Sequence, residues 1–205
     1  MKIIFIVQNE DVSYYEKLDK NGMSTEIETP FELPDGWAWC RGYECFNGME
    51  SRKPMGTCFK YIDIDSIDNN KQQIREAKIV DVHKAPSRAS RAVFEGSVLF
   101  SLVRPYLKNI AIVEADNSDS IASTGFYVAT SNGTFYPRFL YFLMMSNYVV
   151  TGLNQFMKGD NSPSISKEDI LKWLYPVPPF AEQIRIVEHI ENYTTLLKII
   201  ESSLT

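Results

Sequence analysis

Residues 94–110 read Phe94-Glu-Gly-Ser-Val-Leu-Phe-Ser-Leu-Val-Arg-Pro-Tyr-Leu-Lys-Asn-Ile110, and this stretch indicates the class of the fold. The valines, leucines and phenylalanine between Ser97 and Val103 are typical of a short strand bounded by turn residues. Arg104 and Pro105 then break the strand, because proline cannot donate a backbone hydrogen bond. A second strand-like run follows at residues 110–113. The stretch therefore predicts two strands joined by a polar turn.

Runs of the same type recur on both sides of this stretch. They cover residues 58–64, 78–82, 97–103, 110–113 and 126–129. Five short strands at this spacing favour a curled, mostly antiparallel sheet. After Pro137 the apolar residues instead recur at helical spacing as far as residue 151, which predicts one amphipathic helix. A second, short helix is expected after Ser166, because Asp169 stands three residues later in the capping-box position. The fold class predicted is α+β with a few helices.

The C-terminal segment has a different pattern. From Phe180 to the end there is no glycine or proline, and six apolar residues follow one another at steps of four and three. Such a heptad pattern is typical of a coiled coil. The six residues are Ile186, Ile190, Tyr193, Leu197, Ile200 and Leu204. We expect a long coiled-coil-type helix that contacts a partner; the alternative is a helix docked on its own domain. The chain then divides into an extended lead-in at 1–30, a globular domain at 31–178 and this helix at 179–205.

Charge is distributed unevenly along the chain. The 205 residues are 44% hydrophobic and 13% aromatic, which indicates a folded domain, and the net charge is −5. An overall pI near 5.2 excludes a protein that coats polyanions non-specifically. Between Lys84 and Lys108, however, five cations face one carboxylate, a local net charge of +4. A basic segment on an acidic domain favours binding to nucleic acid.

The candidate DNA-binding residues are polar or cationic side chains in this segment and in the polar loop at 157–164. Arginine and short hydroxyl side chains suit phosphate oxygens and guanine edges. They are Lys84, Ser87, Arg88, Arg91, Arg104, Tyr106, Lys108 and Asn109, together with Lys158 and Asn161 of the loop.

Metal, cofactor and membrane features are not expected. The three cysteines Cys40, Cys45 and Cys58 form no metal-binding pair with each other or with the two histidines. We interpret them as reduced thiols of a cytoplasmic protein. Residues 1–7 are apolar over too short a run to act as a signal peptide or to span a bilayer, and a short first strand is the better interpretation.

Catalytic residues are hard to find in this sequence. The best set for a nuclease is Asp63 and Asp65 on one strand face with Glu76 and Lys78 nearby, although such patterns are common by chance. Val177-Pro-Pro-Phe180 lacks the Asn or Asp that an adenine methyltransferase would place before its prolines, and no glycine-rich turn for a methyl donor is present. The chain is therefore interpreted as non-catalytic and free of cofactors.

A series of motifs, in order, resembles the specificity (S) subunit of type I restriction-modification systems. Among them are Ala85-Pro-Ser-Arg-Ala89, Ala122-Ser-Thr-Gly-Phe126 and Pro178-Pro-Phe-Ala-Glu-Gln183. The others lie at residues 15–17, 29–37, 61–67, 96–101, 103–109 and 163–169. The resemblance covers residues 13 to 203.

This resemblance implies a target recognition domain that reads half of a bipartite site in double-stranded DNA, followed by a conserved spacer helix. The implied partners are the methyltransferase (M) subunits and the restriction (R) subunit, which carry the catalysis. The family's full subunit has two recognition domains and two helices, whereas this chain has one of each. We therefore expect a half subunit, two copies of which pair through the helix. The alternatives are an assembly fragment that no longer reads DNA and a stand-alone nuclease.

Overall fold

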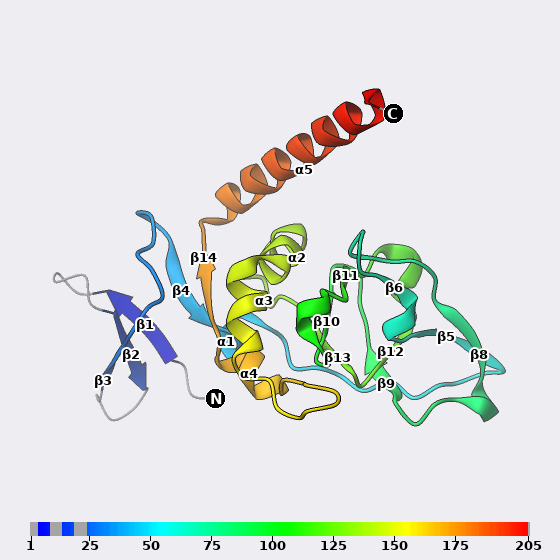
Figure 1. The fold of residues 1–205 in the computed structure, drawn as a ribbon. Coiled ribbons are helices and arrows are strands. Elements are labelled where there is room, and N and C mark those ends of the chain that lie inside the picture. Colours follow the sequence, from blue (N-terminus) through cyan, green and yellow to red (C-terminus); the bar gives the residue numbers. More distant parts are fainter. Residues whose placement is uncertain (1–3, 9–13, 19–23, 205) are drawn as a thin grey trace.

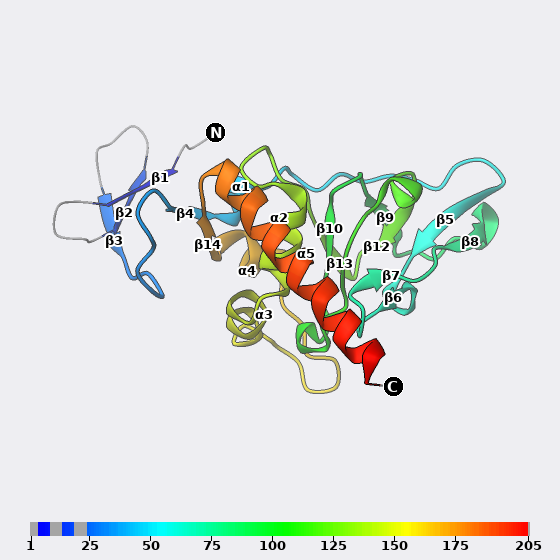
Figure 2. The same ribbon diagram turned by 90° about the horizontal axis from the view of Figure 1, so that it is seen from above.

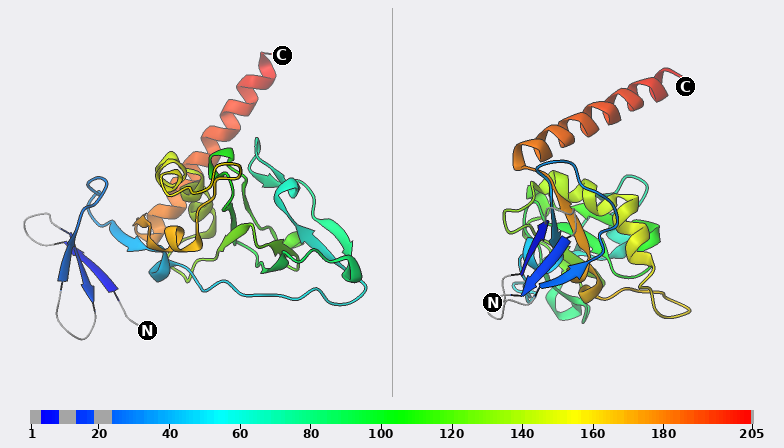
Figure 3. Two further views of the ribbon diagram at one scale, coloured as in Figure 1. Left: turned by 60° about the horizontal axis from the view of Figure 1, so that its bottom comes forward. Right: turned by 90° about the vertical axis from the view of Figure 1, so that its left-hand side faces the viewer.

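The computed structural model describes residues 4–8, 14–18 and 24–204 of the chain. Figure 1 shows a mixed α+β body from which a long C-terminal helix projects, as the sequence predicts. A small sheet of the first strands and a four-stranded sheet lie at opposite ends of the molecule (Figures 1 and 3).

The strands predicted from the sequence are all present, but they divide between two sheets. One sheet has the order β8-β5-β12-β9, in which β5 and β12 run parallel and the other pairs are antiparallel. The other is antiparallel with the order β11-β10-β13. The strands are β5 (Cys58–Ile62), β8 (Lys78–Asp81), β9 (Ala89–Ala92), β10 (Val98–Ser101), β11 (Ile110–Ile112), β12 (Ile121–Ser123) and β13 (Phe126–Ala129). A small hairpin of β6 (Ile67–Asp68) and β7 (Gln73–Ile74) packs beside β11.

The two larger sheets meet at the short connection between β12 and β13. The backbone N–H of Leu102, which follows β10, donates to the Gly125 carbonyl at 2.8 Å. Alternate residues of β10 then face two cores. Leu99 packs with Ala122 and Phe126 between the sheets, while Val98 and Phe100 face the helices. Because strand side chains alternate between faces, one central strand supports both halves of the body.

Two helices cover the outer face of the β11-β10-β13 sheet. They are α2 (Pro137–Met145) and α3 (Asn147–Asn154), whose apolar residues join the core with Val98 and Phe100. The sequence predicts a single helix here, and this is wrong. Ser146 has an extended backbone and ends α2, and its hydroxyl accepts a hydrogen bond from the Val149 N–H at 3.3 Å, so it caps α3.

The predicted short helix is confirmed as α4 (Lys167–Lys172). Its capping box is formed as expected: the Ser166 hydroxyl accepts from the Asp169 N–H, and the Asp169 carboxylate accepts from the Ser166 N–H. After α4 the chain forms β14 (Leu174–Val177), which pairs antiparallel with β4 (Ala38–Arg41). The start and the end of the body are thus neighbouring strands, and the short α1 (Gly42–Cys45) follows β4.

The N-terminal segment is more structured than the extended lead-in that the sequence predicts. Strands β1 (Ile4–Gln8), β2 (Tyr14–Leu18) and β3 (Ser24–Ile27) pair antiparallel in sequence order. The first of them agrees with the expected short strand. Polar residues in β2 and β3 concealed the other two from pattern analysis, because hairpin pairing does not require a buried face.

The C-terminal helix is α5 (Phe180–Ser203), one uninterrupted helix as predicted. Its N-terminal half contacts the body: Gln183 and Val187 are buried, Ile186 packs against the main core, and Glu191 pairs with Arg138 of α2. Four heptad residues beyond them are exposed, with exposed fractions of 65% for Tyr193, 60% for Leu197, 54% for Ile200 and 82% for Leu204. The helix therefore carries an apolar seam that the body does not cover. A membrane-spanning helix is absent from the described part of the chain.

The expectation that all three cysteines are reduced thiols is wrong for two of them. Cys40 of β4 and Cys45 at the end of α1 are joined by a disulfide, and the exposed Cys58 is free. The sequence concealed this pair, because the turn from β4 into the short helix α1 brings the two cysteines together.

A glycine contact between α1 and α4 gives a stability prediction. A Cβ atom on Gly42 would lie 2.6 Å from the Ile170 carbonyl oxygen and 2.9 Å from the Leu171 Cα, so backbone would have to move. We expect Gly42→Ala to lower the free energy of unfolding by about 1–3 kcal/mol, the usual cost of overpacking. Gly48→Ala is the matched control, since a Cβ there meets no atom within 4 Å. Chemical denaturation measures both; an equal change in the two variants would contradict the close contact.

Candidate nucleic-acid interface

A pocket of about 510 Å³ lies where the two larger sheets meet. It brings together Arg88, from the loop before β9, with Arg104 and Asn109, from the turn between β10 and β11. These residues are distant from one another along the chain or separated by a turn, and the packing of the sheets places them around one opening. Three of the ten candidate residues from the sequence therefore share a single site.

Arg104 is held in an unusual backbone conformation at the edge of this pocket. Its φ of 48° and ψ of 57° lie in the left-handed region, which costs a residue with a Cβ about 1–2 kcal/mol. The cost is offset by hydrogen bonds on both sides: its N–H donates to the Pro163 carbonyl at 2.8 Å, and its carbonyl accepts from the Leu107 N–H at 2.9 Å. Strained conformations of this kind gather at binding sites. The turn consequently fixes the point on the pocket rim from which the Arg104 side chain extends.

The loop at 157–164 is attached to Arg104. The Arg104 guanidinium donates to the Asn161 carbonyl at 2.8 Å, while Lys158 and Ser164 exchange backbone hydrogen bonds of 2.9 and 3.0 Å that close the loop at its base. Lys158 and Asn161 are exposed. The loop and the arginine turn therefore form one polar rim beside the pocket.

Arg88 is exposed on the other side of the pocket, and its main chain is fixed. Its carbonyl accepts a hydrogen bond of 2.9 Å from the Thr124 N–H in the connection between β12 and β13. Ser87 and Lys84 precede it on the same exposed segment; Lys84 ends the 3-10 turn at Val82–Lys84. A guanidinium on an anchored backbone is suited to hold an anion at the pocket mouth.

One carboxylate also lines the pocket, and it is paired with a lysine. Asp63 contacts the Lys78 amine at 2.6 Å, and Asp65 lies 3.6 Å from the same amine. The hydrogen bond to Asp63 raises the pKa of the Lys78 amine. The ion pair reduces, but does not cancel, the negative charge beside the two arginines.

The same geometry corrects the nuclease hypothesis. Asp63 and Asp65 do not share a strand face, because β5 ends at Ile62 and Asp63 caps the 3-10 turn Ile64–Ser66. Its carboxylate accepts hydrogen bonds from the Ser66 hydroxyl and the Asp65 N–H, both at 3.2 Å. No group of three or more His, Cys, Asp and Glu side chains suited to a metal ion occurs among the described residues.

Asn109, the third candidate at the pocket, is 8% exposed in its wall. The other candidates do not line the pocket. Lys108 also has a left-handed backbone, and its amine donates to the Asn147 carboxamide oxygen of α3 at 3.2 Å. Tyr106 is 47% exposed on the 3-10 turn Pro105–Leu107, and Arg91 lies on the edge strand β9 opposite Ala122. Arg88 and Arg104 are thus the two cations that line the pocket.

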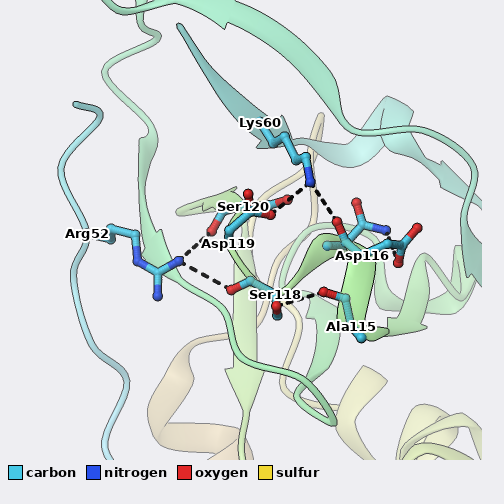
Figure 4. Close-up of polar contacts among 8 residues, drawn as sticks. Arg52, Lys60, Ala115, Asp116, Ser118, Asp119 and Ser120 are labelled. Atoms are coloured by element: carbon cyan, nitrogen blue, oxygen red, sulfur yellow. Dashed lines mark hydrogen bonds and ion pairs between the residues drawn. The ribbon is translucent and has the colours of Figure 1, made fainter. Parts of the chain in front are cut away.

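Two further cations hold a loop rather than an anion. Figure 4 shows Arg52 donating to the Ser118 and Ser120 carbonyls, both at 3.3 Å, and Lys60 bonding the Asp116 carbonyl at 2.7 Å and the Asp119 carboxylate at 3.0 Å. These contacts fasten the connection between β11 and β12 to the four-stranded sheet. Neither residue lines the pocket, so we do not count them in the interface.

The site also contains residues that pattern analysis of charge did not select. Tyr61, Ser123 and Ser162 line the pocket and provide hydroxyl groups between the arginines. Ser123 belongs to the motif at 122–126, but nothing in the sequence indicated that its hydroxyl would lie at the same pocket as the arginines. Uncharged side chains become candidates only when the fold places them beside a charged one.

Comparisons with known proteins agree on one kind of relative. No protein-family profile matches the chain. The type I restriction enzyme EcoAI specificity subunit of Escherichia coli is 24% identical over 181 residues, which are 82% of this chain and 30% of that protein. The HindI specificity subunit of Haemophilus influenzae is 25% identical over 131 residues, or 62% of this chain and 28% of that protein.

Solved structures give stronger similarity. The crystal structure of the HsdS subunit from Thermoanaerobacter tengcongensis matches with a TM-score of 0.79 and 37% identity, over 85% of this chain and 46% of that chain. A structure describing complex assembly and conformational transition of the type I R-M system matches with a TM-score of 0.78 and 36% identity, over 84% and 46%. The S subunit from M. genitalium, at 10% identity and a TM-score of 0.52, shares the fold alone. The chain thus spans about half of the solved relatives and under a third of the curated ones.

Proposed function

Since this chain is related to the specificity subunits of type I restriction enzymes and matches about half of a solved one, we propose that it is a DNA-recognition module. In this proposal residues 31–178 form one target recognition domain, which binds half of a bipartite site in double-stranded DNA. Residues 179–205 form the spacer helix, and residues 1–30 lead into the domain. The observation that carries the proposal is the pair Arg88 and Arg104 at one pocket between two sheets.

Electrostatics supports a DNA partner. The protein has a net charge of −5, so most of its surface repels a polyanion, whereas the segments around the pocket carry exposed cations. Four of these lie on the three segments that border the pocket: Lys84, Arg88, Arg104 and Lys158. Contacts with phosphate fix the register of a protein on the duplex, while base edges give sequence specificity. We assign the arginines to the backbone and leave sequence reading to the exposed loop that contains Asn161.

Methyl transfer and cleavage belong to partner subunits in this proposal. The described residues include no metal-binding group of side chains, and the best acidic set is paired with Lys78. The partners are the methyltransferase and restriction subunits named for the family, and the compartment is the cytoplasm, where host and foreign DNA are met. The module itself directs these subunits to DNA and catalyses no reaction.

A second copy of the chain completes the bipartite reader. One recognition domain reads one half-site, so two are required, and α5 carries an exposed apolar seam at heptad spacing. Two copies related by a two-fold axis would place the same seam against itself. We propose that the chain forms a homodimer through α5.

The proposal is tested by the salt dependence of binding to random duplex DNA. Four phosphate contacts per domain predict a slope near −3.6 for the logarithm of the association constant against that of salt, about −0.9 for each contact. Fluorescence anisotropy with a labelled duplex between about 50 and 200 mM salt measures it. Absence of binding at low salt, or a flat response, would refute the DNA proposal and leave assembly through α5 as the function.

A further inference from the structure

We infer that Gln183 is a positioning residue: with Arg138 it forms a polar clamp that fixes the direction in which α5 leaves the recognition domain. The direction of α5 sets where a second domain stands and hence the spacing between two DNA half-sites. This last step rests on the proposed function, whereas the clamp itself does not.

Gln183 is fully buried and joins three parts of the chain. Its amide nitrogen donates to the Thr134 and Pro178 carbonyls, both at 3.0 Å, and its amide oxygen accepts from the Tyr136 N–H at 2.8 Å. Thr134 and Tyr136 belong to the turn that leads into α2, and Pro178 precedes α5. Leaving any of these buried polar groups unpaired would be costly, so the bonds hold α5 in one place.

Arg138 adds a contact two turns further along the helix. Its guanidinium pairs with Glu114 at 3.1 Å and with Glu191 of α5 at 3.1 Å. Glu114 precedes the 3-10 turn Ala115–Asn117, so the arginine connects the sheet region, α2 and α5. Gln183 and Glu191 are eight residues apart, about 12 Å along a helix. Two contacts at this separation resist a tilt better than one.

Beyond the clamp, the rest of α5 projects freely, so a small tilt at its base becomes a larger displacement at its end. All described residues from Glu191 onward are exposed, and Figures 2 and 3 show this part of α5 projecting above the body. From Glu191 to Ser203 the free part of the helix is about 18 Å long at 1.5 Å per residue. A tilt of about 10° would move its end by about 3 Å, close to the 3.4 Å rise of one base pair. Small changes at Gln183 therefore become changes of half-site spacing.

The clamp is tested first without DNA, by the distance between two spin labels. One label is placed on Cys58, the exposed free cysteine, and the other on a Ser203→Cys substitution at the end of α5; excess unlabelled protein isolates single chains. We expect one narrow distance distribution for the parent chain and a clear broadening or a shift of several ångströms for Gln183→Leu. Arg138→Met, which removes only exposed ion pairs, should broaden it less. Glu188→Gln is the control and should change nothing.

Unchanged distributions in both Gln183→Leu and Arg138→Met would overturn the clamp. If Gln183→Leu does not fold, Arg138→Met still decides the test, because Arg138 makes its ion pairs at the surface. A narrow, unshifted distance distribution in Arg138→Met would then contradict the inference.

Half-site spacing is the second measurement. Duplexes with two copies of the half-site recovered from a random pool are compared over a range of separations. The parent chain should favour one separation, and the clamp variants should accept at least one neighbouring separation while single half-site affinity stays within about twofold. A merely structural role of Gln183 would lower all affinities together instead. Loss of DNA binding by the parent chain would refute the proposed function but leave the spin-label result standing.

Discussion

Replacing both Arg88 and Arg104 with methionine is expected to weaken binding to random duplex DNA by about 100-fold or more at low salt. A hydrogen bond to a charged group contributes about 1.5–3 kcal/mol, and about 1.4 kcal/mol corresponds to a factor of ten in affinity. The two guanidinium groups lie at the same pocket, so the variant removes the centre of the cation set. The slope against salt should fall from about −3.6 to about −1.8, since each lost phosphate contact removes about 0.9.

A matched control separates this local effect from net charge. Lys167→Met with Lys198→Met also removes two positive charges, but from α4 and α5, away from the pocket. This control should bind random duplex within a few-fold of the parent chain. An equal loss of affinity in both double variants would show that overall charge, and not the pocket, governs binding. Because Arg104 also holds the loop at Asn161, thermal unfolding of each variant should confirm that the domain stays folded.

The second large effect concerns self-association. Leu197→Glu with Ile200→Glu is expected to convert a dimer into a monomer, because it places two carboxylates in the apolar seam of α5. Both side chains are more than half exposed in the single chain, so the change should leave the fold of the domain intact. Burying each of them in a partner would contribute about 1.5–3 kcal/mol, which the substitution removes. Light scattering after size-exclusion chromatography should give the mass of one chain, 23.5 kDa, for the variant and twice that mass for the parent chain.

A control variant places negative charge on α5 next to the apolar seam rather than in it. Thr195→Glu with Lys198→Glu adds acidic residues on the same exposed turns but outside the heptad positions, and it should remain dimeric. A parent chain that is monomeric at all accessible concentrations would refute pairing through α5. Dissociation of both variants would instead indicate that charge repulsion, independent of position, breaks the dimer.

Local features of the fold could be predicted from the sequence, and long-range ones could not. Turn residues and runs of β-formers located β5, β8, β10, β11 and β13, and Ser166 with Asp169 located α4, because these signals lie within a few residues. The short strands β6, β7, β9 and β12 were not predicted. Pairing between β4 and β14 joins Trp39 to Pro176, and no local pattern reports a partner so far along the chain. The break at Ser146 was missed because apolar residues continue at helical spacing on both sides of it.

The candidate site shows the same division. Local charge predicted a basic segment, but sequence could not show which cations converge. Arg88 and Arg104 meet because the two sheets join at Gly125, whereas Lys108 turns towards Asn147 of α3. Arg52 has the same charge as Arg88, and only the structure shows that its donors serve the carbonyls of Ser118 and Ser120.

The pairing of β4 with β14 has an evolutionary consequence. These neighbouring strands are the points at which the polypeptide enters and leaves the body, and Ala38 stands opposite Val177 at the outer end of the pair. A domain whose two ends lie together tolerates exchange or insertion as a unit. Because α5 is held through Gln183 and Glu191 by Thr134, Tyr136 and Arg138 of the body, an exchanged segment must keep these contacts for α5 to stay in place. On the proposed function, exchange of the rest of residues 42–173 between genes would then give new DNA specificities with no change to the exposed seam of α5.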